Sequence, residues 1–148
     1  MGEAKVFGTS EVGVGERRWP ALHVDMGNPH AVAWVEDLDD AGPLTEAPAF
    51  DALTYPDGVN IEFALVAGER HLAMRVHERG SGETHSCGTG ACAVMVAAAL
   101  ADQPDGGARD VDYRVDLPGG TLRIRWTAGG RVLMSGPALI VARGTTDL

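Results

Sequence analysis

The sequence predicts an α+β fold in which a curled, mostly antiparallel and barrel-like β-sheet wraps around one central buried helix. Apolar residues alternate with polar or small ones in several short segments, which is typical of strands. One segment breaks this pattern: residues 89–101 read TGACAVMVAAALA, without charge or proline. Because it is rich in helix formers and apolar all round, we expect a helix buried on every side. A lone buried helix among short antiparallel strands implies a sheet that curls around it.

The alternating segments recur along the chain. We expect strands at Leu22–Asp25, Ala31–Val35, 59–65, 72–76, 113–117, 122–126, Arg131–Met134 and Ala138–Ala142. A turn at Ala67–Arg70 joins the third and fourth segments into an antiparallel hairpin. The turn Pro118-Gly119-Gly120 joins the fifth and sixth in the same way, and Gly129-Gly130 leads into the next strand. The helix is expected to end at Asp102-Gln103-Pro104.

Length and charge limit the classes of function. The 148 residues predict a single domain, 1–148, with a hydrophobic core. The formal net charge of −9 argues against nucleic-acid binding, and an anionic substrate would have to be held by local groups. The one lysine, Lys5, lies near a terminus that we expect to be frayed. Pyridoxal phosphate requires a Schiff-base lysine within its site, so we expect amino-acid chemistry without a cofactor.

The cysteines and apolar runs indicate the cellular setting. Cys87 and Cys92 are too few for a disulfide framework and are not spaced as CxxC. The longest apolar run, near residues 91–101, is too short to span a bilayer, and no signal-like segment opens the chain. We therefore expect a reduced, cytoplasmic protein without a membrane partner. No grouping of His, Cys and carboxylates has zinc spacing, so no metal is expected.

Residues 78–90, ERGSGETHSCGTG, place a cysteine at the expected start of the helix. A helix N-terminus carries unpaired N–H groups and partial positive charge, which favour the thiolate of Cys87. The N–H groups of Gly88 and Thr89 can hold a substrate carboxylate, with its Cα beside the sulfur. This geometry suits removal of an α-proton. The alternative is that Cys87 is a small core residue. Cys92 lies about 140° around the helix from it, so we expect Cys92 in the core.

The run ERGSGETHSCGTGACA resembles the signature around the second catalytic cysteine of the diaminopimelate epimerases. The segments MGNPHAV and YPDGVNIEF resemble two further family segments, in the same order. The PGG turn and the closing SGPALIVARG are similar to the family's tail. The resemblance extends from about Val24 to Gly144. It implies interconversion of L,L- and meso-diaminopimelate in lysine and peptidoglycan precursor biosynthesis, with two cysteines on opposite faces of Cα and no cofactor.

The resemblance also implies roles for individual residues. Cys87 matches one of the two catalytic cysteines, the proton acceptor in one direction. Asn28 and Asn60 would hydrogen-bond the distal end of the substrate, and Arg79 would support its carboxylate. Glu78 and His30 would tune the protonation of the cysteines. Gly88 and Thr89 would form the carboxylate cradle. The simpler alternatives are turn residues for the two asparagines and a solvated ion pair for Glu78 and Arg79. His85 lies two residues before Cys87, and its role stays open.

The family has two similar domains with the active site between them. The resemblance implies that this chain is the C-terminal half, inactive alone, and that its partners are diaminopimelate and an N-terminal domain carrying the other cysteine. The oligomeric state stays open, a homodimer included. A proline racemase-type isomerase is an alternative, although an aspartate usually stands there where this chain has His85 and Ser86. A non-catalytic module that binds an amino acid or a partner protein is the alternative from another class.

Overall fold

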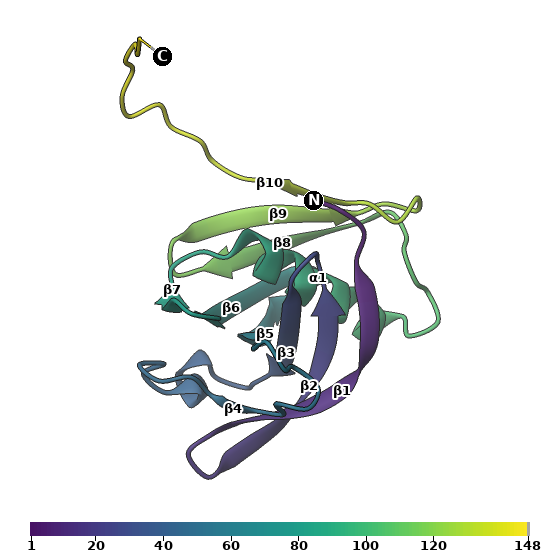
Figure 1. The fold of residues 1–148 in the computed structure, drawn as a ribbon. Coiled ribbons are helices and arrows are strands. Elements are labelled where there is room, and N and C mark those ends of the chain that lie inside the picture. The colour runs from purple at the N-terminus through teal and green to yellow at the C-terminus, as the bar shows by residue number, and fades with distance from the viewer. Residues whose placement is uncertain (148) are drawn as a thin grey trace.

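A computed structural model describes residues 1–147. Within that range, ten strands form one sheet that curves around a single α-helix (Figure 1). The elements are β1 (Lys5–Val14), β2 (Arg17–Asp25), β3 (Pro29–Trp34), η1 (Leu38–Ala41), β4 (Ala49–Phe50), β5 (Asn60–Gly68), β6 (His71–Glu78), β7 (Gly82–Thr84), α1 (Gly88–Asp102), β8 (Val111–Leu117), β9 (Gly120–Trp126) and β10 (Val132–Ser135). The strand order is β10-β9-β8-β6-β5-β3-β2-β1-β4, and β7 pairs with β6 beside this path.

Most neighbouring strands are antiparallel, but β3–β5 and β6–β8 are parallel. A parallel pair requires a crossover connection. The β6–β8 crossover contains α1, which lies against the sheet on its concave side (Figure 1). The β3–β5 crossover, residues 35–59, contains η1 and β4 and packs on the opposite face. Strands β3 and β5 are therefore covered on both faces, as parallel strands usually are.

The core forms two clusters, one on each face of the sheet. The larger surrounds α1, in which every residue from Gly90 to Ala99 is buried. The smaller lies under residues 35–59 and includes Phe63 and Tyr55. The expectation of a helix buried on every side and wrapped by a curled sheet is confirmed. The small side chains of α1 suit this position, because they let strands approach the helix from several directions.

Both predicted hairpins are confirmed, as β5–β6 and β8–β9. The predicted strand at Ala138–Ala142 is wrong. Residues 136–147 lie outside the helices and strands and extend away from the body (Figure 1), and Leu139, Ile140 and Val141 are 85%, 70% and 87% exposed. Alternation is a local signal, whereas a strand requires hydrogen bonds from a neighbour. After Ser135 the chain leaves the sheet and meets no such neighbour within the described range.

The N-terminal segment is better ordered than the sequence suggests. Lys5 begins β1 and pairs with Asp25 of β2, so the expected fraying there is wrong. Before it, the carbonyl of Gly2 accepts a hydrogen bond from the N–H of Val132 over 3.1 Å, and Glu3 forms a bridge with Arg131. These contacts join the first residues to the edge strand β10. Residues 1–147 contain no helix with the length and hydropathy of a membrane span.

Candidate active site

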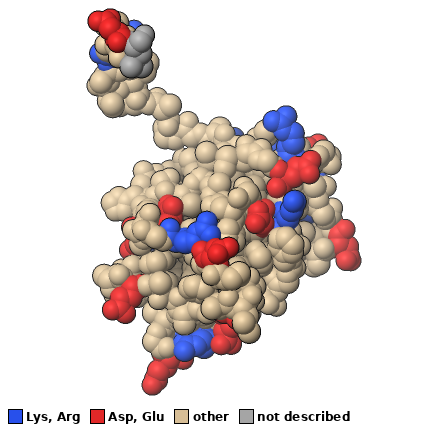
Figure 2. Space-filling model, viewed as in Figure 1, with Lys and Arg blue, Asp and Glu red and all other residues tan. Residues whose placement is uncertain are grey.

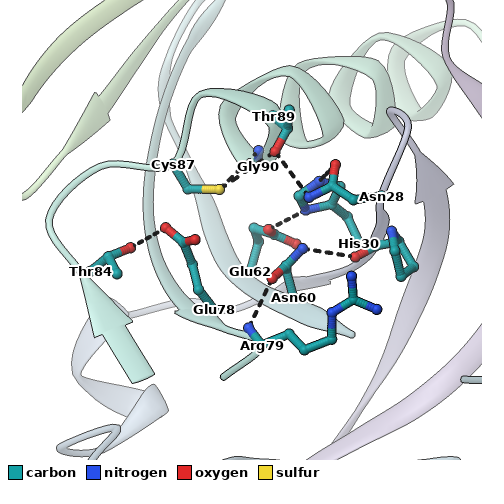
Figure 3. A network of polar contacts seen from close by, with 11 residues as sticks. Asn28, His30, Asn60, Glu62, Glu78, Arg79, Thr84, Cys87, Thr89 and Gly90 are labelled. Atoms are coloured by element: carbon teal, nitrogen blue, oxygen red, sulfur yellow. Dashed lines mark hydrogen bonds and ion pairs between the residues drawn. The ribbon is translucent and has the colours of Figure 1, made fainter. Parts of the chain in front are cut away.

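The N-terminus of α1 presents a cysteine as its capping residue. Cys87 has an extended backbone, with φ −136° and ψ 105°, and its Sγ accepts a hydrogen bond from the N–H of Gly90 over 3.3 Å (Figure 3). The Thr89 hydroxyl lies 3.7 Å from the same sulfur. The first helical hydrogen bond runs from Ala91 to the carbonyl of Cys87, so the N–H groups of Gly88 and Thr89 precede the helical ladder. The predicted helix start is therefore confirmed.

The ionisation of Cys87 differs from the sequence expectation. The thiol is only 7% exposed, and burial raises its pKa above the ordinary value. The hydrogen bonds from Gly90 and Thr89 lower the pKa, whereas the charges of Glu62 and Glu78 raise it again. The net shift is upward, although the donors at the helix start act in the expected direction and lower the pKa. Desolvation of a thiolate outweighs the few donors that the helix start supplies.

The other cysteine is a core residue, as the helical spacing predicts. Cys92 is fully buried, and burial raises its pKa to about 12. Its surroundings are the apolar residues of the larger core cluster. Cys92 therefore offers no proton-transfer group to the outside of the helix start.

Neighbouring side chains fill the space beside Gly88 and Gly90, the two glycines that follow Cys87. A Cβ on Gly88 would lie 3.1 Å from the Met134 sulfur of β10. A Cβ on Gly90 would lie 2.7 Å from Oε1 of Glu62 and 3.1 Å from Sγ of Cys87. The sequence suggests that these glycines admit a ligand, but in this structure neighbouring side chains use the space that they leave.

His30, on β3, connects the helix start to the sheet. Its Nε2 lies 3.1 Å from Oδ1 of Asn28, and the Asn28 amide nitrogen lies 3.4 Å from Oγ1 of Thr89 (Figure 3). The imidazole is fully buried, whereas Asn28 and Thr89 are partly exposed. The structure thus brings together four residues that the sequence singles out, including Cys87, although they come from two distant segments.

Glu62 is a site residue that the sequence reading missed. It lies on β5, is fully buried, and places Oε1 2.6 Å from Nδ1 of His30. Burial raises its pKa, and the neighbouring His30 opposes that shift. Alternation assigns Glu62 to the solvent side, because Ile61 and Phe63 flank it. The signal was nevertheless present, since Glu62 is the one charged residue in the run VNIEFALVA, residues 59–67.

Asn60 uses both ends of its amide to hold the backbone. Its Nδ2 donates to the carbonyl of Pro29 over 3.1 Å, and its Oδ1 accepts from the N–H of Arg79 over 2.9 Å. Asn60 therefore links the start of β3 to the residue that follows β6. The Arg79 guanidinium donates a hydrogen bond to the carbonyl of Asp57 over 3.1 Å, and the side chain of Arg79 packs against Gly58. These two residues lie at one side of the site, with Arg79 on its exposed rim (Figure 3).

Glu78, the last residue of β6, accepts a hydrogen bond from the Thr84 hydroxyl over 2.5 Å. Its charge raises the pKa of Cys87, so the two acidic groups interact.

His85 has an exposed side chain, and its backbone carbonyl accepts a hydrogen bond from the N–H of Gly119 over 2.7 Å. Within the described range, no three His, Cys, Asp or Glu side chains group as metal ligands. Acidic and basic groups are interspersed on the face shown in Figure 2.

The arrangement can supply proton transfer from one direction. A thiol stands at a helix start with backbone donors beside it, and these donors can bind a carboxylate. The neighbouring side chains, His30 and Glu62 among them, are held by buried hydrogen bonds. Cys92 is fully buried, so it cannot serve as a second proton-transfer group opposite Cys87.

A family profile described as diaminopimelate epimerase matches residues 22–141. A diaminopimelate epimerase of Streptomyces coelicolor is 59% identical over 99% of this chain and 52% of the relative. One from Synechococcus elongatus is 44% identical over 94% of this chain and 48% of the relative. The chain thus spans about half the length of these relatives. A phenazine biosynthesis protein of the PhzF family from Bacillus anthracis gives a TM-score of 0.42 at 18% identity, covering 90% of this chain and 40% of that one.

Proposed function

Because the chain belongs to the diaminopimelate epimerase family, we propose that it supplies the C-terminal half of a two-domain site that interconverts L,L- and meso-diaminopimelate. The observation that carries this proposal is the position of Cys87 at the start of α1, with the N–H of Gly90 on its sulfur. The reaction is a step toward lysine and peptidoglycan precursors. In the proposal it requires no cofactor, because thiols move the protons.

The substrate's reacting end binds at the start of α1. Its carboxylate accepts hydrogen bonds from the N–H groups of Gly88 and Thr89, which places Cα beside the sulfur of Cys87. Inversion of a carbon requires a base on one face and an acid on the other. Cys87 serves one face, and a second domain supplies the cysteine for the opposite face and closes over the substrate.

The raised pKa of Cys87 suits one direction of this reaction directly. A protonated thiol is the form that returns a proton to Cα. In the reverse direction Cys87 must first lose its proton, and the donors from Gly90 and Thr89 stabilise the resulting thiolate. His30 and Glu78 tune this balance in the proposal, because both lie in the network around the thiol.

The distal end of diaminopimelate is itself an amino acid, and the polar groups beyond Cys87 can recognise it. Asn28 is partly exposed and points its amide toward Thr89. Asn60 retains one amide hydrogen after its bond to Pro29. The exposed Arg79 guanidinium can pair with the distal carboxylate. We assign these three residues to that end of the substrate.

The test joins this chain to the part of the Streptomyces coelicolor relative that it does not match. The joined protein is expected to interconvert the two isomers, and in heavy water the product should carry deuterium at Cα. Cys87→Ala should abolish both signals, whereas Cys92→Ala, in a chain shown to be folded, should retain them. Substrate binding without any turnover or exchange would contradict the proposal and favour a binding module.

A further inference from the structure

A buried carboxyl–imidazole pair lies beneath the first turn of α1. Glu62 and His30 are both fully buried, and 2.6 Å separates Oε1 of Glu62 from Nδ1 of His30. The second oxygen of Glu62, Oε2, has no hydrogen-bond partner among the described residues. An acidic group is rarely placed in an apolar interior without a specific partner, because its desolvation is costly. The position of Glu62 therefore calls for a functional explanation.

Glu62 and Cys87 face each other across Gly90. The point at which a Gly90 side chain would begin lies 2.7 Å from Oε1 of Glu62 and 3.1 Å from Sγ of Cys87. The carboxyl and the thiol thus flank the same small, largely buried space. In such surroundings two negative charges oppose each other strongly, so ionisation of one group disfavours ionisation of the other.

The hydrogen-bond chain sets where the protons lie. Oδ1 of Asn28 can only accept, so Nε2 of His30 must carry a hydrogen to bond it. One further proton is then shared between Nδ1 of His30 and Oε1 of Glu62. The pair is an imidazolium with a carboxylate, or an imidazole with a carboxylic acid. In both forms Glu62 fixes the imidazole orientation, which in turn directs the Asn28 amide nitrogen toward Thr89.

We propose that Glu62 is a positioning residue for the thiol chemistry of Cys87, an inference that rests on the proposed function. Its carboxyl holds His30, and through His30 it holds Asn28 and Thr89 beside the sulfur. When the shared proton lies on His30, the negative charge of Glu62 opposes formation of the thiolate and so favours the form of Cys87 that returns a proton to the substrate. Glu62 touches neither substrate nor sulfur in this role, and it acts through the groups between them.

Other titratable groups also face Cys87. They are His30 on β3, Glu78 on β6 and Cys92 on α1 itself. Both carboxylates raise the pKa of Cys87, and the contribution of Glu62 is the larger. Removal of either charge should therefore lower the pKa, and removal of Glu62 should lower it more.

The experiment uses the full chain without substrate. The rate of iodoacetamide labelling at Cys87 is measured against pH by mass spectrometry, which resolves Cys87 from Cys92. In Glu62→Gln, which keeps the shape and an oxygen for His30, the labelling midpoint should fall by on the order of one pH unit. Glu78→Gln should give a smaller fall. Glu69→Gln, a surface change far from α1's N-terminus, should give none. An unchanged midpoint in folded Glu62→Gln would overturn the proposal.

A second measurement needs no variant at position 62. Nitrogen-15 NMR follows the His30 imidazole of the native chain during an alkaline titration, with the signal identified by its loss in His30→Gln. The His30 resonances should shift at the pH at which Cys87 ionises, because the three groups are coupled. His30 resonances that do not shift at the pH at which Cys87 ionises would also overturn the proposal. Neither measurement involves epimerisation. If Cys87 is coupled to Glu62 and His30 but the joined protein does not epimerise diaminopimelate, only the proposed function is refuted.

Discussion

The N–H of Gly90 donates a hydrogen bond to the sulfur of Cys87, the residue that caps the same helix. A cap usually satisfies one orphan N–H group with a side-chain oxygen. Here the acceptor is a thiol, so the group that completes the helix is also the proposed proton carrier. This double role explains why α1 begins where it does and why the sulfur has a fixed position relative to the backbone donors.

Gly90→Ala should destabilise the fold, although alanine is the better helix former. The new methyl would lie 2.7 Å from Oε1 of Glu62, which is held by His30, and 3.1 Å from Sγ of Cys87. Such overpacking costs about 1–3 kcal/mol of unfolding free energy, measured by urea denaturation. Gly8→Ala is the control, because nothing lies within 4 Å of its added Cβ. Equal stability of the two variants would show that the space beside Cys87 is not tight.

Asn60→Ala should cost more stability than Asn28→Ala. Asn60 is 5% exposed and holds two backbone groups, the carbonyl of Pro29 and the N–H of Arg79. Leaving such groups unpaired in the interior costs about 1–3 kcal/mol. Asn28 is partly exposed, and water can replace its contacts. Urea denaturation of both variants measures the difference. A larger loss for Asn28→Ala would contradict the structural role assigned to Asn60.

Labelling of the two cysteines should differ in both rate and pH dependence. Iodoacetamide reacts with thiolates, and burial raises the pKa of both thiols, that of Cys92 to about 12. Cys87 should therefore label slowly near neutral pH and faster as the pH rises through a midpoint above the ordinary thiol value. Cys92 should stay unlabelled until the chain unfolds. Mass spectrometry after short exposures checks this, and labelling of folded Cys92 first would contradict it.

The sequence was sufficient for the curled sheet, the buried helix and the position of Cys87. Those features depend on local periodicity and on an uncharged run, both of which can be read directly. Strands β1, β4 and β7 were missed, because hydrogen bonds to a neighbouring strand, rather than a pattern of their own, make them strands. Ala138–Ala142 shows the converse, a strand-like pattern without a partner in the described structure.

The site was predicted less completely, and the reason is burial. The helix start indicated a thiolate at Cys87, but desolvation depends on the strands and side chains packed around it. The role of Glu62 depends on α1, whose first turn covers the face of β5 on which Glu62 lies, whereas Ile61 and Phe63 face the crossover, residues 35–59. Without that helix, alternation would place Glu62 in solvent. Both errors arise because tertiary packing decides which polar groups are exposed.

The isolated chain should not interconvert L,L- and meso-diaminopimelate. Cys87 can serve one face of Cα, but Cys92 is fully buried and cannot serve the other. The chain alone also leaves the substrate open to water, which weakens the interactions that stabilise a carbanion. The assay follows deuterium incorporation and stereochemistry for both isomers in heavy water. Conversion by the pure chain, lost in Cys87→Ala, would refute this expectation and require a second proton donor from another copy. If Cys87 serves only one face of Cα, conversion should begin only when the remaining half is joined, and Cys87→Ala should abolish it.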